Sequence, residues 1–472
     1  MPFCSYVLKN ATLFPHALSV SLGLFICLVT PLEVCGKEIQ ETRTEKLQKF
    51  SVTKPFFYTL DNGLKLVVDV DNRAPVVSHT IWYKVGAADE KDGESGIAHF
   101  LEHLMFRGTN NFEAGYFSKR ISELGGNDNA FTTHDLTAYY QNIPTQHLEE
   151  IMEMEANRMR HIQITEEELI KERNVVLEER ALRTDTNPTA QLFEQMNASL
   201  FRNHPYRAPV IGWKHEIEAL NKKQVMAFYH QYYAPNNAVV TIVGDVDPSH
   251  VFEIAQATYG KIKPSKHINI NRQRPSEPPQ IATREITLTH PNVTVDNLFL
   301  MLEALSPTHS PKEFHALSAA INHIAGGAHS ILYKKLVKQQ KIALSVGAFI
   351  ASDKLDNASL IFQMTPANHV SLNVLKAAFK KELMDIINKG IDKQDIEREK
   401  NAMLANYITS FDSRTNRAHL WGKNLAFNKT LSDIIQTPKI IASITPDDAN
   451  IVLQSVFTPQ NQVWGYLKRI KP

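Results

Sequence analysis

The chain has 472 residues, of which 43% are hydrophobic and 21% are charged, and its formal net charge at pH 7 is +1. This length predicts more than one domain, and the composition is typical of a soluble globular protein. A net charge so close to zero argues against a nucleic-acid partner and against an electrostatic membrane anchor.

The first element is an apolar run over residues 17–32, with no acidic residue before Glu33. It is short for a membrane span but has the length of a signal-peptide core. We therefore interpret residues 1–36 as a secretory signal peptide, with a retained membrane anchor as the alternative, and expect no membrane span in the mature chain. All the cysteines lie in this leader, so the mature chain should hold neither a disulfide nor a thiolate zinc ligand. They are Cys4, Cys27 and Cys35.

Apolar periodicity and turn residues then predict alternating strands and helices up to residue 262. A hairpin is expected over residues 56–70, because its centre, Asp61-Asn62-Gly63, contains the Asn-Gly pair that favours tight turns. The other elements expected here are a strand over 76–85, a helix over 96–107, a strand pair over 128–143, helices over 145–161 and 165–184, and a buried strand over 237–246 that leads into a helix from Pro248.

A basic, proline-rich segment around Arg272 interrupts this pattern and predicts a linker over 263–283. The order of elements then starts again, with strands near 284–305, a helix from Pro311, strands near 342–366, helices over 370–389, 393–410 and 413–427, and a last strand over 462–468. The similar order suggests a duplicated α+β unit in two domains, residues 50–262 and 284–472, although no sequence repeat is visible.

The motif His99-Phe100-Leu101-Glu102-His103 lies on the predicted helix over 96–107. Residues four apart share a helical face, so His99 and His103 can present their imidazoles to one metal ion. Glu102 lies at the edge of that face and can take a proton from a metal-bound water without being a ligand. The order is the reverse of the His-Glu-x-x-His zinc motif. The alternative is an ordinary pair of helix histidines.

A third ligand is expected from the helix over 165–184, because a catalytic zinc usually has three protein ligands and an open position. Glu172 and Glu179 are two helical turns apart and share a face, and Val175 and Val176 should anchor that helix in the core. Glu179 would complete the ligand set, and Glu172 would orient a ligand histidine. The alternative is a charged, solvated helix face.

Several segments around these residues are similar to those of one family of metallopeptidases. They are Gly96-Ile97-Ala98, Leu104 to Thr109, Gly125 to Thr132, His204-Pro205-Tyr206, Tyr233 to Asn237 and Gly244-Asp245-Val246. From about residue 54 to the C-terminus the chain resembles the pitrilysin/insulinase family, in particular its processing-peptidase-like subfamily. That family has a glutamate about 76 residues after the His-x-x-Glu-His motif, and 179 − 103 = 76 selects Glu179 over its neighbour Glu178.

The resemblance implies a zinc-dependent endopeptidase with one zinc ion per chain, acting on extended or unfolded peptides. It implies an α+β fold of two homologous α/β-sandwich domains, each a mixed, mainly antiparallel sheet with packed helices, which form half of a clam-shell chamber. A substrate peptide would add as a strand to a sheet edge. Asn129 and Ala130 match the edge strand that binds substrate in the family; a turn is the alternative reading of Asn129.

The second half departs from the family's pattern. Active relatives carry an arginine and a tyrosine seven residues apart, which bind substrate and stabilise the oxyanion, and Val337 and Leu344 stand at these positions here. The resemblance therefore implies a division of labour in which this chain bears the metal and a homologous second subunit supplies the Arg/Tyr pair. One alternative is a self-sufficient monomer or homodimer in which Tyr333 or Lys338 substitutes. Another is a non-catalytic binding or assembly protein, against which the intact Glu102 argues.

The predicted leader, the absence of cysteines after residue 36 and the subfamily resemblance together predict an exported protein of the bacterial periplasm.

Overall fold

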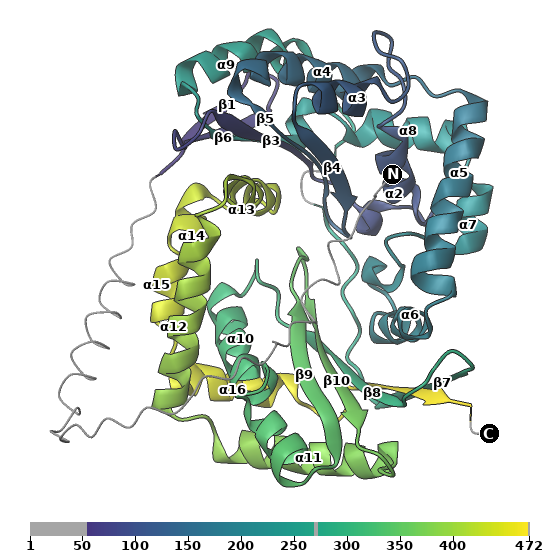
Figure 1. Ribbon diagram of the computed structural model, residues 1–472, viewed down its shortest axis with the longest axis vertical. Helices are drawn as coiled ribbons and strands as arrows, with labels where there is room; N and C mark the ends of the chain where they lie inside the picture. Colours follow the sequence, from purple (N-terminus) through teal and green to yellow (C-terminus); the bar gives the residue numbers. More distant parts are fainter. Residues whose placement is uncertain (1–53, 269–271, 471–472) are drawn as a thin grey trace, which may run out of the picture. The chain divides into compact units, whose positions relative to one another are not determined.

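The computed structural model describes residues 54–268 and 272–470, which form two mixed β-sheets with helices packed against them (Figure 1). The expected α+β fold with two mixed sheets and packed helices is confirmed. The signal peptide predicted over 1–36 lies outside the described residues, as do residues 50–53 of the predicted first domain.

The first sheet has six strands, which lie in the order β1 (Phe56–Thr59), β2 (Lys65–Val70), β6 (Ala238–Gly244), β3 (Val76–Tyr83), β5 (Thr137–Pro144) and β4 (Asn127–Thr132). In this sheet, β2 and β6 are the one pair of neighbouring strands that run parallel, and the other neighbouring pairs run antiparallel. The predicted hairpin and the predicted strand pair over 128–143 are both present. On its outer side, β4 pairs with no other strand of the described chain, so the main chain of this edge is available for pairing.

The second sheet has five strands, which lie in the order β7 (Arg284–His290), β11 (Val463–Arg469), β8 (Asn297–Ala304), β10 (Ala358–Pro366) and β9 (Ala343–Ala351). Its only parallel neighbours are β7 and β11. The last described strand, β11, therefore lies between β7 and β8 rather than at an edge of the sheet.

The described helices of the first half are α2 (Ile97–Leu104), α3 (Tyr116–Glu123), α4 (Leu148–His161), α5 (Glu166–Arg180), α6 (Pro188–Leu200), α7 (Lys214–Ala219), α8 (Lys222–Tyr232) and α9 (Pro248–Ala257). Those of the second half are α10 (Pro311–Ala325), α11 (Leu372–Lys389), α12 (Lys393–Ser410), α13 (Arg414–Ala426), α14 (Leu431–Ile435), α15 (Thr437–Ala442) and α16 (Pro446–Val456). The helices expected over 145–161, 165–184, 370–389, 393–410 and 413–427 are confirmed. Sequence patterns missed α3, α6–α8 and α14–α16, several of which are too short for a clear helical period.

One helix from each half packs on the sheet of the other half. Helix α13 lies against β3 and β6, where Trp421 and Leu425 share a buried cluster with Trp82. Helix α6 lies against β7, β8 and β11, and its Leu192 and Met196 are buried there. The domain boundaries at 262 and 284 remain a prediction, and α6 and α13 each pack on the sheet that lies on the other side of these boundaries in the sequence.

Helix α13 approaches the first sheet closely at Gly422, which is buried, and a Cβ at this position would overlap the indole ring of Trp82. We therefore expect Gly422→Ala to lower the free energy of unfolding by about 1–3 kcal/mol, the usual cost of overpacking. Gly347→Ala on β9 is the matched control, because its Cβ would meet nothing within 4 Å. Thermal unfolding of both variants measures the difference, and equal melting temperatures would show that α13 can move away without cost.

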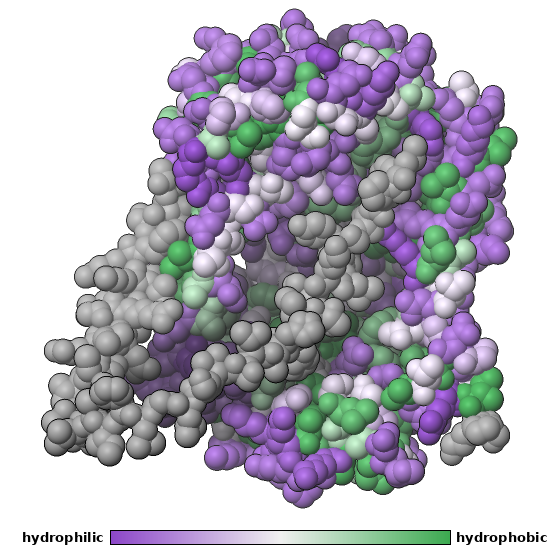
Figure 2. All heavy atoms as spheres, viewed as in Figure 1, coloured by the Kyte–Doolittle hydropathy of each residue, from purple (hydrophilic) through white to green (hydrophobic). Residues whose placement is uncertain are grey.

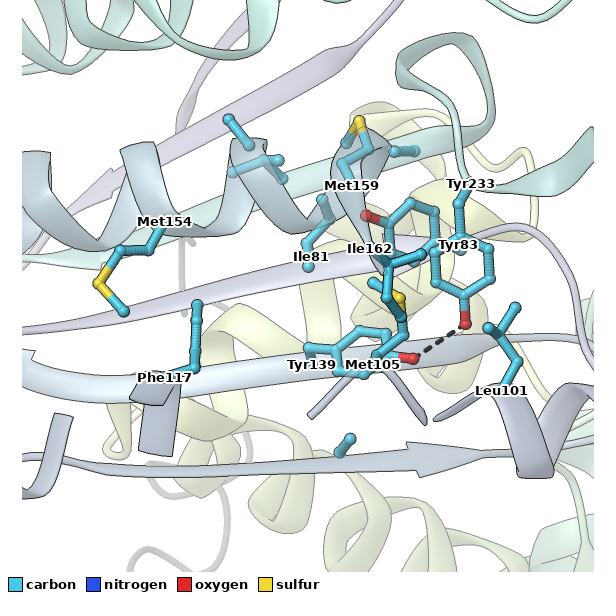
Figure 3. Close-up of a cluster of buried hydrophobic side chains, with 14 of the residues drawn as sticks. Ile81, Tyr83, Leu101, Met105, Phe117, Tyr139, Met154, Met159, Ile162 and Tyr233 are labelled. Carbon is cyan, nitrogen blue, oxygen red and sulfur yellow. Dashed lines mark hydrogen bonds between the residues drawn. The ribbon is translucent and has the colours of Figure 1, made fainter. Parts of the chain in front are cut away.

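A buried cluster under α2 fixes the orientation of that helix (Figure 3). Leu101 and Met105 point into it beside Tyr83, and the hydroxyls of Tyr139 and Tyr233 form a hydrogen bond of 2.9 Å there. The side of α2 that carries Leu101 and Met105 is therefore held against the sheet.

On the face that Figure 2 shows, the coloured surface is mainly hydrophilic, with smaller hydrophobic areas between. Within residues 54–268 and 272–470, no helix is both long and apolar enough to cross a membrane.

Candidate metal site

The start of α2 is held by a carboxylate rather than by a capping side chain of its own. The helix begins after Gly96, whose φ of 87° suits a glycine. The carboxylate of Glu90 accepts hydrogen bonds from the main-chain nitrogens of Gly96 and Ala98, at 3.0 and 2.9 Å. A carboxylate at a helix N-terminus satisfies main-chain donors that the helix cannot pair internally. Glu90 thus helps to fix the helix that carries the His-x-x-Glu-His motif.

Helix α5 begins with a capping box between Thr165 and Glu168. Its inner face carries Glu172 and Val176, four residues apart and both buried. Val176 is fully buried, but Val175 is 44% exposed, so the prediction that both valines anchor the helix was wrong for Val175. Consecutive residues lie about 100° apart around a helix, and the buried face of α5 includes Val176 but not Val175.

The three predicted ligands come together between α2 and α5. His99, His103 and Glu179 each offer one ligand atom, and these atoms lie within 4.8 Å of one another. The Nε2 atoms of His99 and His103 are 3.8 and 3.1 Å from Oε2 of Glu179. A zinc ion bound at about 2.0–2.2 Å from each ligand requires donor atoms in this range of separations. The ligand roles themselves stay a prediction.

The electrostatics of the three groups suit a cation. Burial, and then the neighbouring His103, lowers the pKa of His99 to about 3, which keeps its imidazole neutral. Burial would raise the pKa of Glu179, but the hydrogen bond with His103 and electrostatic interactions with His99, His103 and Arg183 lower it to about 2. A neutral imidazole and an ionised carboxylate are the forms that bind metals. Nδ1 of His99 is buried without a hydrogen-bond partner among the described residues.

His103 contacts Glu172, the residue predicted to orient a ligand histidine, and the orienting role itself stays a prediction. The Nδ1 atom of His103 lies 3.0 Å from Oε1 of Glu172, and Arg107 pairs with the other carboxylate oxygen. A donor bond from Nδ1 leaves Nε2 of His103 free to face a metal. Arg183 lies 2.7 Å from Oε1 of Glu179. Neither arginine was singled out as a site residue from the sequence. Arg107 contacts the site through Glu172, and Arg183 contacts it through Glu179.

Glu102 lies beside the ligand cluster and is 8% exposed. Burial raises the pKa of its carboxyl to about 7. Its Oε2 accepts a hydrogen bond of 2.6 Å from the hydroxyl of Thr132 on β4. A carboxylate with a pKa near neutral is suited to general acid–base work. Thr132 was given no role of its own in the sequence analysis, although it is the last residue of the segment Gly125 to Thr132 that resembles the family.

Asn129 and Ala130 both lie within β4. Asn129 is therefore in the edge strand and not in a turn, and its Oδ1 accepts a hydrogen bond of 2.8 Å from the main-chain nitrogen of Ala130. Ala130 is 4% exposed. The substrate-binding role of both residues stays a prediction, which the free outer side of β4 favours.

In the second half, Val337 packs against the buried cluster of the second sheet, and Leu344 on β9 is 54% exposed. Neither side chain offers a hydrogen-bond donor. The proposed substitutes contact each other, since the ammonium of Lys338 lies 5.6 Å from the ring centroid of Tyr333.

Comparisons with known proteins agree on one family. The model described as insulinase (peptidase family M16) matches residues 66–214, and the model described as peptidase M16 inactive domain matches residues 219–403. The zinc protease PqqE of Helicobacter pylori is 31% identical over 375 residues, which cover 78% of this chain and 83% of that protein. The uncharacterized zinc protease YmxG of Bacillus subtilis is 25% identical over 404 residues, which cover 85% of this chain and 95% of that protein.

Solved structures show the same relationship. The crystal structure of a protease from Helicobacter pylori matches with a TM-score of 0.82 and 27% identity, over 89% of this chain and all of that one. The first half of the periplasmic protease PqqL from Escherichia coli matches with a TM-score of 0.74 and 20% identity, over 89% of this chain and 92% of that one. Against the longer PqqL structure the match covers 90% of this chain but 49% of that chain.

Proposed function

The chain belongs to the M16 (insulinase) family of peptidases, and from this premise we propose that it is a zinc-dependent endopeptidase that cleaves extended or unfolded peptides. The observation that carries the proposal is the convergence of His99, His103 and Glu179 with a buried carboxylate, Glu102, beside them. The name "zinc protease" of its relatives supports the choice of metal.

The residues present fit zinc, because two imidazoles and a carboxylate leave one position of a tetrahedral ion open. Zinc held there would supply Lewis acidity and a bound water of lowered pKa. Glu102 accepts the proton of the attacking water and later passes it to the nitrogen of the leaving amine. Thr132 holds the Glu102 carboxylate, and Glu172 holds His103. The outer side of β4 pairs with the main chain of the peptide, which gives affinity with little demand on its sequence.

We further propose that the active form contains a second, homologous subunit that supplies the missing Arg/Tyr pair. Val337 and Leu344 support this, because both are aliphatic and stand where active relatives carry the pair. PqqL also supports it, because the matched region covers 49% of its chain, which leaves room for a second half of similar length. The relatives described as periplasmic support export to the bacterial periplasm. A homodimer, and a non-catalytic assembly protein, are the alternatives.

The second subunit can be tested with the chain from residue 37 onward, loaded with zinc and given an unstructured fluorogenic peptide library. Each missing oxyanion donor costs about 3 kcal/mol of transition-state stabilisation. We therefore expect the chain alone to be slow, and kcat to rise at least about 100-fold when a homologous chain bearing the Arg/Tyr pair is added. Full activity of the chain alone would refute the second subunit while leaving the peptidase proposal in place.

A further inference from the structure

The candidate ligands come from two helices, two histidines from α2 and a glutamate from α5, so the site depends on how these helices are held. We propose that Arg180 is a positioning residue that fixes α5 against the start of α2, and so sets the separation of Glu179 from the two histidines. This inference rests on the proposed zinc site.

Arg180 is the last residue of α5 and directly follows Glu179. Its side chain is 6% exposed, and its guanidinium forms two hydrogen bonds with the carboxylate of Glu194 on α6, at 2.9 and 3.1 Å. It also donates a bond of 2.8 Å to the main-chain oxygen of Gly212. A guanidinium bound in this two-point manner has little freedom to move, and Lys cannot reproduce its planar geometry.

Gly212 in turn lies against the residues that precede α2. A Cβ on Gly212 would come within 2.5 Å of the main-chain oxygen of Ser95, and a Cβ on Gly96 within 2.6 Å of that of Ile211. Both glycines also have positive φ angles, 89° and 87°. The hydroxyl of Ser95 accepts a bond of 2.9 Å from the nitrogen of Trp213. The main chain at Ile211 and Gly212 therefore packs directly against the main chain at Ser95 and Gly96, three residues before His99.

The two helices are thus joined at two points. The pair His103–Glu172 joins them at the C-terminal end of α2, and the path from Arg180 through Gly212 joins them at its N-terminal end. Together with the buried cluster that both helices share, these two connections hold the angle between the helices. Glu179, which lies next to Arg180 in sequence, is placed by that angle.

The test compares Arg180→Met with Lys171→Met in the full chain. Lys171 is also on α5, but it is 67% exposed and pairs with Glu167 at the surface. Zinc affinity, measured by competition with a chromophoric chelator, should fall at least about ten-fold in Arg180→Met, as for other residues that orient metal ligands. It should be unchanged in Lys171→Met and partly recovered in Arg180→Lys, which keeps the charge but not the geometry.

Glu194→Gln supplies a second measurement that remains available if Arg180→Met does not fold. Its zinc affinity should fall in the same direction, and the double variant should be no weaker than Arg180→Met, because both changes break one path. If folded Arg180→Met or Glu194→Gln binds zinc as tightly as the unaltered chain and only melts earlier, the inference is refuted. If the unaltered chain binds no zinc, the proposed function fails and this inference fails with it.

Discussion

Glu102→Gln is expected to lower kcat for peptide cleavage by about 10²–10⁴-fold while leaving the zinc content of the protein unchanged. Glutamine has the shape of glutamate, and its amide oxygen can still accept the bond from Thr132. It cannot accept the proton of the attacking water. Glu102 is also not one of the three groups whose ligand atoms converge, so its substitution removes no ligand.

The measurement is the cleavage rate of a fluorogenic peptide, with zinc determined by metal analysis of the same samples. Thr132→Val is the matched variant, because it keeps the Glu102 carboxylate and removes the hydroxyl that donates a hydrogen bond to it. It should lose less activity than Glu102→Gln. Full activity in Glu102→Gln would show that another group is the base, and loss of zinc would show that Glu102 is a ligand.

Glu179→Ala is expected to weaken zinc binding by more than the roughly 10–100-fold that follows the loss of an outer-shell partner. A protein that binds zinc only when folded is stabilised by it, by about 2.7 kcal/mol at a concentration 100 times Kd. A variant with a 100-fold weaker site should lose this zinc-dependent stabilisation at the same concentration. Glu179→Ala removes a carboxylate that pairs with Arg183. Because Arg183 is 46% exposed, water can solvate its charge, and the variant should remain folded without metal.

Thermal unfolding with and without zinc measures this effect. Glu178→Ala is the matched control, since Glu178 is the adjacent residue on α5 and is exposed. Its melting temperature should rise with zinc as in the unaltered chain. An unchanged zinc response in Glu179→Ala would mean that the third ligand lies elsewhere.

Much of the candidate site could be predicted because its residues obey local spacing rules. His99 and His103 are four positions apart, and Glu172 and Glu179 are two helical turns apart, so a helical period places each pair on one face. The sequence distance from His103 to Glu179 does not by itself show that the two helices lie close together. The match to the spacing of a known family gave that expectation. The same rule applied to adjacent residues failed at Val175, where only Val176 faces the core.

The contacts that could not be predicted are those between elements far apart in the chain. Thr132 donates its hydrogen bond to Glu102 because β4 lies beside α2. Arg180 donates one to Gly212, which lies in a loop that no periodic sequence pattern predicts. The packing of α6 and α13 on the sheet of the opposite half belongs to the same class. The helical pattern of α13 is visible in the sequence and that of α6 was missed, but in both cases the sheet that the helix covers is set by the tertiary fold.

The most direct test of the account is the position of zinc in a crystal of the zinc-loaded chain, located by anomalous scattering at the zinc absorption edge. The account predicts one strong peak per chain, about 2.0–2.2 Å from Nε2 of His99, Nε2 of His103 and a carboxylate oxygen of Glu179. The carboxylate of Glu102 should lie close to the open coordination position without being a ligand. A strong peak at other residues, or no peak at these three, would contradict the proposal that this chain is a zinc peptidase.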